Sequence, residues 1–168
     1  KYYEQSKYYI DAMATYNALG KKLRLITKIQ KIIASLKGIK TIVDFGCGVG
    51  SDSLHLSDAG YKLTAMDIEG IALDFTRFRI KKYKKSIKVV AQKDNAKIPN
   101  CDLILSLDTL EHVFDPYKTV DQMVAAKPKV MLLTTAFGVH DEHQGGIPMH
   151  TDHNVRKVEQ YIESKGYK

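Results

Sequence analysis

The chain is poor in cysteine and has no long hydrophobic stretch, and each absence excludes a class of protein. Its two cysteines, Cys47 and Cys101, lie far apart and in no metal-ligand spacing, so we expect reduced thiols and a cytoplasmic protein. No apolar run approaches the roughly 20 residues that span a bilayer, so we expect no membrane anchor. The first residues are polar and aromatic, unlike a signal peptide, although a chain that begins with Lys1 can be an excerpt.

Acidic residues are also scarce relative to basic ones, 19 against 26, which gives a formal net charge of +7. Much of the excess lies in two basic clusters, at 21–40 and at 77–85. A basic surface can serve RNA or phosphorylated substrates, but charged runs more often only keep helix faces in water. Because no nucleic-acid motif accompanies the charge, we expect solvated helices rather than a nucleic-acid partner.

Repeats, low-complexity tracts and Pro/Gly-rich linkers are absent, and 168 residues correspond to one domain. Apolar residues recur every three or four positions over 1–36, which predicts helices interrupted at Gly20 and stopped at Gly38. Beyond that point apolar runs rich in β-branched residues alternate with helical patterns. We expect strands at 41–45, 61–67, 86–91, 101–106 and 130–135, and helices at 51–59, 71–82, 116–126 and 155–165.

This alternation predicts an α/β protein with a Rossmann-like parallel sheet and helices on both faces. We expect a helical segment at 1–38 and the α/β domain at 39–168, together forming a single domain. Right-handed crossovers place the carboxyl ends of the strands at one edge, where ligands bind. Ser51 or Asp52 is expected to cap the helix that follows the first strand.

Three glycines at alternate positions follow the first predicted strand, in Asp44-Phe45-Gly46-Cys47-Gly48-Val49-Gly50. Glycine lets the backbone turn sharply and lets a ligand approach without an intervening Cβ. The dinucleotide fingerprint G-x-G-x-x-G would need glycine where this chain has Ser51. A carboxylate at Asp44 would repel a pyrophosphate but suits the ammonium group of a methionine moiety. This glycine loop, residues 44–50, therefore favours S-adenosylmethionine over NAD or a flavin dinucleotide.

Asp67 ends the second predicted strand. A carboxylate there can accept hydrogen bonds from both hydroxyls of a ribose. Dinucleotide folds use the same device, so Asp67 supports a nucleoside ligand without separating the two cofactors.

Three stretches together resemble class I S-adenosylmethionine-dependent methyltransferases, particularly the small-molecule branch that includes ubiquinone-biosynthesis O-methyltransferases. These stretches are 43–50, 66–67 and 102–113, and the resemblance runs from about 42 to 166. In that family the glycine loop wraps the methionine portion, and an acidic residue at the position of Asp67 holds the ribose. The resemblance and the loop together imply cofactor contacts at Asp44, Phe45, Gly46, Cys47, Gly48, Gly50, Asp67, Ile68, Asp94, Asn95, Leu107 and Asp108.

The segment after the fourth predicted strand holds a candidate base. His112 could deprotonate a substrate hydroxyl, because imidazole titrates near neutral pH. Glu111 and His112 could equally cap a helix and shape the pocket. Some relatives in the ubiquinone branch bind a divalent ion through a similar pattern, so the resemblance allows Asp108, Glu111 and His112 as metal ligands, although we do not expect a metal.

Two other groups of residues are candidates for the acceptor side. Histidines crowd the segment 137–154, where His150 is favoured as a substrate contact or base and paired imidazoles could also hold zinc or iron. N-terminal tyrosines could form a lid over the site or simply pack a helix. The full sets are His140, His143, His150 and His153, and Tyr2, Tyr3, Tyr8 and Tyr9.

The family fold has seven strands and ends in an antiparallel hairpin, whereas this chain supplies five strands and the start of a sixth. We therefore expect the final hairpin to be missing or truncated, leaving an edge for a homodimer partner or a larger parent chain. The predicted function is S-adenosylmethionine-dependent methylation of a small-molecule acceptor, at oxygen by resemblance. Alternatives are an RNA methyltransferase that uses the basic surface, and a non-catalytic cofactor-binding domain of a larger protein.

Overall fold

The computed structural model describes residues 7–18, 20–93, 97–135 and 154–167. Its strands follow the order β3-β2-β1 in one part of the chain, and β4 pairs with β5 in the other. In chain order the elements are α2 (Lys7–Ala18), α3 (Lys21–Ser35), β1 (Thr41–Phe45), α4 (Ser51–Asp58), β2 (Lys62–Ile68), α5 (Ile71–Lys82), β3 (Ile87–Gln92), β4 (Leu103–Leu107), η1 (Leu110–His112), α6 (Pro116–Ala125), β5 (Val130–Thr134) and α7 (Val155–Ser164). The chain divides into two compact units, Lys1–Ala96 and Lys97–Lys168. Among the described residues, no helix is long and apolar enough to span a bilayer.

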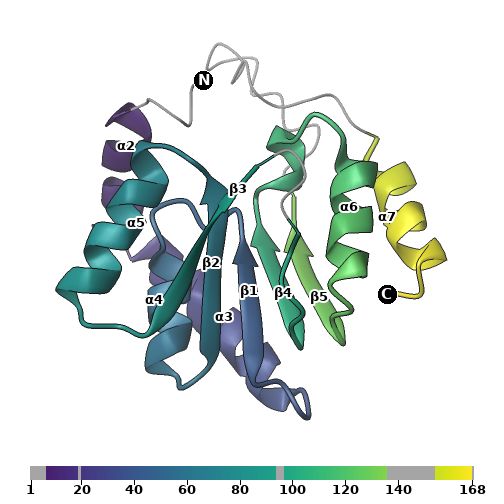
Figure 1. Ribbon diagram of the computed structural model, residues 1–168, viewed down its shortest axis with the longest axis horizontal. Coiled ribbons are helices and arrows are strands. Elements are labelled where there is room, and N and C mark those ends of the chain that lie inside the picture. The colour runs from purple at the N-terminus through teal and green to yellow at the C-terminus, as the bar shows by residue number, and fades with distance from the viewer. Residues whose placement is uncertain (1–6, 19, 94–96, 136–153, 168) are drawn as a thin grey trace. The chain divides into compact units, whose positions relative to one another are not determined.

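In the first unit β1, β2 and β3 lie side by side and pair in parallel (Figure 1). The register sets Asp44 of β1 opposite Ala65 of β2, and Asp67 of β2 opposite Ala91 of β3. Parallel strands end at the same edge of their sheet. The two acidic residues that the sequence singled out therefore lie at the carboxyl-terminal edge of neighbouring strands.

Four helices complete the first unit. Gly20 separates α2 from α3 in a left-handed conformation with a φ of 69°, which confirms the predicted interruption. The apolar face of α3 buries Ile26, Ile29 and Ile33, so this helix shares the core of the unit. Helix α4 contacts β2 and β3, and α5 contacts β3.

The start of α4 differs from the prediction. Its N-cap is Gly50, which supplies no side-chain cap, and neither Ser51 nor Asp52 takes that place. Both side chains have other partners, because Asp52 forms an ion pair with Lys22 at 2.5 Å and the Ser51 hydroxyl accepts a hydrogen bond from Arg79. The predicted cap was wrong because tertiary contacts engage the polar groups of the first turn.

In the second unit β4 and β5 pair in parallel, and α6 lies beside α7 (Figure 1). Helix α6 begins with the favoured signals, since Asp115 accepts the Lys118 N–H at 3.0 Å and proline occupies the first turn. The rings of Tyr117 and Tyr161 meet edge to face at 5.1 Å, which joins α6 to α7. Local capping and aromatic packing thus account for this helix pair.

The predicted α/β class with a parallel sheet is confirmed, and the five expected strands and four later helices all form within a few residues of their expected bounds. The segment 137–154, expected as a loop, lies outside the described residues apart from its last position. The division at residue 38 stays a prediction.

Candidate functional site

The glycine loop turns sharply at the end of β1. The N–H groups of Gly46 and Cys47 both donate to the carbonyl of Met66 in β2, at 2.8 and 3.1 Å, and the Gly50 N–H donates to the Cys47 carbonyl at 2.9 Å. These bonds fasten the start of the loop to β2 and close a tight turn before α4. The loop thereby presents its backbone at the edge where β1 and β2 end.

Two of the loop glycines have backbone conformations that favour glycine, and both lie close to other side chains. Gly48 and Gly50 have φ values of 53° and 74°, in the left-handed region that most side chains avoid. A Cβ on Gly48 would lie 2.4 Å from the Tyr9 hydroxyl oxygen, and one on Gly50 would lie 2.7 Å from a methyl carbon of Thr76. The backbone here lies close to Tyr9 and Thr76, and the approach of a ligand to these glycines stays a prediction.

Asp67 joins the end of β2 to the glycine loop. One carboxylate oxygen accepts the Gly48 N–H at 2.6 Å, and the other accepts the Ile68 N–H at 2.7 Å. Burial raises the pKa of Asp67, while these two backbone hydrogen bonds favour the charged form. Each oxygen retains further lone pairs, so the carboxylate can still accept hydrogen bonds from two hydroxyls of a ligand.

Asp44 is buried behind the loop and is only 2% exposed. Its carboxylate accepts a hydrogen bond of 2.6 Å from the Ser53 hydroxyl. Burial, followed by the negative charge of Asp52, raises the pKa of Asp44 to about 7, although the Ser53 hydrogen bond and Lys22 act in the opposite direction. A cationic ligand would favour the ionised form of this carboxyl group.

The remaining side chains of the loop are apolar or inert. Phe45 is fully buried in the core, so only its backbone could meet a ligand. Cys47 is buried, and burial followed by the charges of Asp44 and Asp67 raises the pKa of its thiol well above the usual range. The thiol therefore stays protonated and is a poor nucleophile.

Helix α5 contributes contacts that the sequence did not indicate. The Thr76 hydroxyl donates to the Gly48 carbonyl at 2.8 Å, and the Arg79 guanidinium donates to the Val49 carbonyl at 2.6 Å. No local pattern could have identified them, because both residues lie about 30 positions from the loop and read as ordinary positions of a basic helix.

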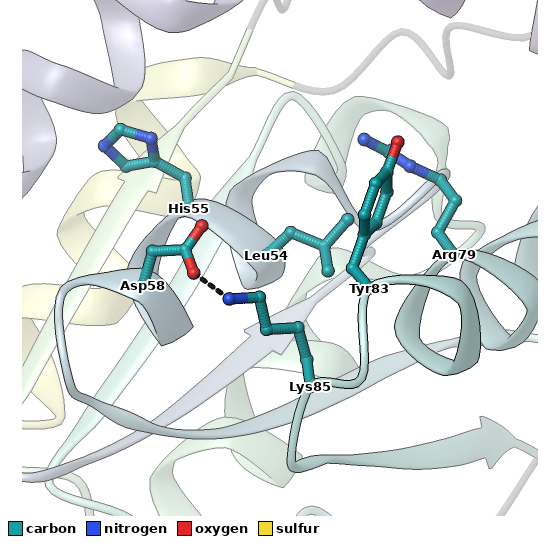
Figure 2. Close-up of a pocket in the computed structure, with 6 residues that line it drawn as sticks. All are labelled: Leu54, His55, Asp58, Arg79, Tyr83 and Lys85. Atoms are coloured by element: carbon teal, nitrogen blue, oxygen red, sulfur yellow. Dashed lines mark hydrogen bonds and ion pairs between the residues drawn. The ribbon is translucent and has the colours of Figure 1, made fainter.

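The first unit also has an open pocket of about 410 Å³, which Figure 2 shows near the ends of α4 and α5. Lys85 and Asp58 form an ion pair across it. None of the predicted site residues lines this pocket, whose lining is Leu54, His55, Asp58, Arg79, Tyr83 and Lys85. Size alone does not mark it as the site, because the glycines and buried carboxylates lie elsewhere in the unit.

The second unit carries the other predicted residues. Leu107 is buried at the end of β4, and Asp108 follows it with a φ of 51°, a strained value for a residue with a side chain. Thr134 of β5 holds Asp108, since its carbonyl accepts the Asp108 N–H at 2.9 Å and its hydroxyl donates to the Asp108 carboxylate at 2.9 Å. Glu111 is buried and His112 is partly exposed, both within η1.

Several predicted residues lie outside the described part of the chain. They include the expected cofactor contacts Asp94 and Asn95, the histidine His150 with its neighbours, and Tyr2 and Tyr3. Of the tyrosines that are described, Tyr9 lies against Gly48 and Tyr8 is exposed. Within the described residues no three acidic, histidine or cysteine side chains gather as a metal site, and this includes Asp108, Glu111 and His112.

Known proteins resemble this chain over most of its length. A family model of the methyltransferase domain matches residues 16–163. The chain is 29% identical over 123 residues to the ubiquinone biosynthesis O-methyltransferase of Hydrogenovibrio crunogenus. The matched residues make up 70% of this chain and 51% of that protein. The chain thus spans about half the length of this curated relative.

Two solved structures show the same fold. Phosphoethanolamine N-methyltransferase 2 of Haemonchus contortus, in complex with S-adenosyl-L-methionine, matches with a TM-score of 0.71 at 18% identity, over 85% of this chain and 36% of that one. A SAM-dependent methyltransferase from Aquifex aeolicus matches with a TM-score of 0.66 at 19% identity, over 84% of this chain and 78% of that one.

The parallel α/β fold and the glycine loop define a Rossmann-like protein with a candidate nucleoside site. The family match covers most of the sequence, and the chain belongs to the methyltransferase domain family. The resemblance to class I S-adenosylmethionine-dependent methyltransferases is confirmed.

Proposed function

We propose that the chain binds S-adenosylmethionine at the glycine loop and transfers its methyl group to an oxygen of a small-molecule acceptor. The observation that carries the proposal is the partly buried Asp67 carboxylate, hydrogen-bonded to the Gly48 N–H at the end of β2. Membership of the methyltransferase domain family supports the methyl donor. The name of the Hydrogenovibrio crunogenus relative, an O-methyltransferase, supports oxygen as the accepting atom.

The residues of the site fit a nucleoside with a cationic amino-acid tail. Asp67 keeps lone pairs for two ribose hydroxyls while its hydrogen bonds from Gly48 and Ile68 fix the orientation of the carboxylate. Asp44 can offer a negative charge to an ammonium group, and its burial strengthens that attraction relative to water. A dinucleotide fits less well, because the pyrophosphate would meet this buried carboxyl group.

Bound S-adenosylmethionine would supply an electrophilic methyl group on a sulfonium, with a neutral thioether as the leaving group. The chain itself then has to orient the acceptor, exclude water and, for a hydroxyl acceptor, accept its proton. His112 is the proposed base, since it is partly exposed and an imidazole is neutral over much of the physiological pH range. His150 is proposed as a second acceptor-side residue.

A transfer assay with a methyl-labelled donor tests the proposal. We expect label to move to a low-molecular-weight phenol or alcohol in a panel that also contains amines, carboxylates and RNA. Asp67→Asn should abolish most of the transfer, whereas Asp121→Asn, a control on the exposed face of α6, should retain it. Transfer to RNA alone, or an Asp67→Asn variant with unchanged turnover, would overturn the proposal.

The role of His112 is tested by the dependence of kcat on pH. His112→Gln should lower kcat and remove the rise in rate as pH increases through the pKa of the imidazole. His55→Gln is the matched control, because the His55 ring is hydrogen-bonded to Gln30 in a contact between α4 and α3. An unchanged profile in His112→Gln would show that the acceptor proton leaves by another route.

A further inference from the structure

Thr76 of α5 is fully buried, and both branches of its side chain contact the glycine loop. The hydroxyl donates to the Gly48 carbonyl at 2.8 Å. The methyl group lies against Gly50, where a Cβ would approach it to 2.7 Å. One side chain therefore holds two alternate glycines of the loop from the α5 side.

Arg79, one turn further along α5, holds the next part of the loop. Its guanidinium donates to the Val49 carbonyl at 2.6 Å and to the Ser51 hydroxyl at 2.9 Å. The side chain is partly buried, and its guanidinium lies over the Phe75 ring with 5.9 Å to the ring centre. A hydrogen bond from a charged donor is stronger than a neutral one, so this bridge fixes the point where the loop enters α4.

These contacts determine which way the loop peptides face. The described peptide bonds are trans, and a trans peptide directs its N–H and C=O to opposite sides. Because Thr76 holds the Gly48 carbonyl, the N–H of Val49 in the same peptide is turned away from Thr76. Asp67 at the same time holds the Gly48 N–H, so consecutive peptides of the loop are fixed by side chains from β2 and α5.

We propose that Thr76 and Arg79 are positioning residues that set the glycine loop in its donor-binding conformation. Neither side chain has to touch the donor, since each acts through a loop carbonyl. The proposal rests on the proposed function, because it assigns these residues to the site that binds S-adenosylmethionine. It adds α5 to the parts of the chain that determine donor affinity.

The first test separates the two branches of Thr76. Thr76→Val keeps the shape and removes the hydroxyl donor, and it should raise the Kd for S-adenosylmethionine about tenfold, as expected for a buried carbonyl left without a donor. Thr76→Ser keeps the hydroxyl and should restore the Kd to within about twofold of wild type. Thr119→Val is the control, because this buried residue of α6 donates its hydroxyl to the carbonyl of the N-cap residue Asp115, away from the glycine loop.

The readouts distinguish positioning from general stability. Thermal unfolding measures the stability that each variant loses, and the loss should be smaller in Thr119→Val because the Asp115 carbonyl still accepts the Thr119 N–H. Only Thr76→Val should raise the Kd and the donor KM, with the acceptor KM unchanged. A Kd equal to that of wild type in Thr76→Val, or an equal rise in Thr119→Val, would overturn the inference. Failure of the unaltered chain to bind the donor would instead refute the proposed function and remove the basis of the inference.

Arg79 provides a second test, at a side chain that is only partly buried, whereas Thr76 is fully buried. Arg79→Met should weaken donor binding, and Arg79→Lys should recover part of the loss because lysine keeps a charged donor without the rigid planar guanidinium. Arg77→Met is the control, since Arg77 pairs with the exposed Glu69 and Asp74. Equal donor affinities for the Arg79→Met and Arg77→Met variants would contradict the proposed role.

Discussion

Asp44 should make donor binding depend on pH. Its pKa is raised to about 7, first by burial and then by Asp52, while Ser53 and Lys22 favour the charged form and Asp67 disfavours it. A cationic donor requires the ionised carboxylate, so binding should displace a proton from the fraction of molecules in which Asp44 is neutral. We therefore predict that affinity for S-adenosylmethionine rises as pH increases through neutrality.

The size of the effect follows from this pKa. About one tenth of the Asp44 carboxyl groups are ionised one unit below their pKa and about nine tenths one unit above it. The apparent Kd should consequently be about ten times larger at about pH 6 than at about pH 8. The free energy of unfolding should change in the opposite direction, falling as pH rises. The pKa of Asp44 in the folded chain exceeds its unfolded value of about 3.9, so the stability that Asp44 contributes at low pH is lost as pH rises through the folded pKa.

Calorimetric titration across this pH range measures the effect directly. Titrations in buffers of different ionisation enthalpy should show proton release on binding at about pH 6 and little at about pH 8. Asp44→Asn should bind more weakly and with a nearly flat pH dependence, which separates Asp44 from Asp67, whose pKa burial also raises. Asp121→Asn should behave as wild type, because Lys165 and Tyr161 lower the pKa of that exposed carboxyl group. A flat profile in wild type, or an identical slope in Asp44→Asn, would refute the reasoning.

Three further predictions follow from contacts in the first unit. Gly48→Ala should weaken donor binding at least tenfold by calorimetry, because a side chain strains the left-handed backbone and its Cβ would displace the Tyr9 hydroxyl; unchanged affinity would contradict this. Lys22→Met should lower the urea-derived free energy of unfolding by about 3 kcal/mol, since it removes the positive charge that pairs with the buried Asp52; a loss below about 1 kcal/mol would show that the ion pair contributes only as much as a surface pair. Asp67→Asn should raise the Kd for the nucleoside adenosine as well as for the full donor, and an effect on the full donor alone would place the ribose elsewhere.

Much of the fold was predictable because its signals are local. The β-branched run of β1 and the periodicity of α5 define those elements, and α5 begins and ends at the predicted residues. Gly20 interrupts the N-terminal helices as expected, because a left-handed residue ends a helical run. The glycine loop was predictable for the same reason, since its alternate glycines reflect backbone conformations that other residues rarely adopt.

Other features of the site depend on contacts between distant residues and were not predictable. The cap of α4 was wrongly assigned because Asp52 pairs with Lys22 of α3, which no local pattern shows. The contacts of Thr76 and Arg79 with the loop arise only when α5 folds back beside it. The chemical identity of the acceptor is not encoded in a spacing at all, since it depends on the shape of a pocket.

Calorimetric titration of the whole chain with S-adenosylmethionine, beside a titration with NAD, tests the central claim most directly. We predict saturable binding of one donor per chain, weakened in both Asp44→Ala and Asp67→Ala, and no measurable binding of NAD. Binding of NAD in place of S-adenosylmethionine, or donor binding that neither substitution weakens, would contradict the assignment of the glycine loop as the methyl-donor site.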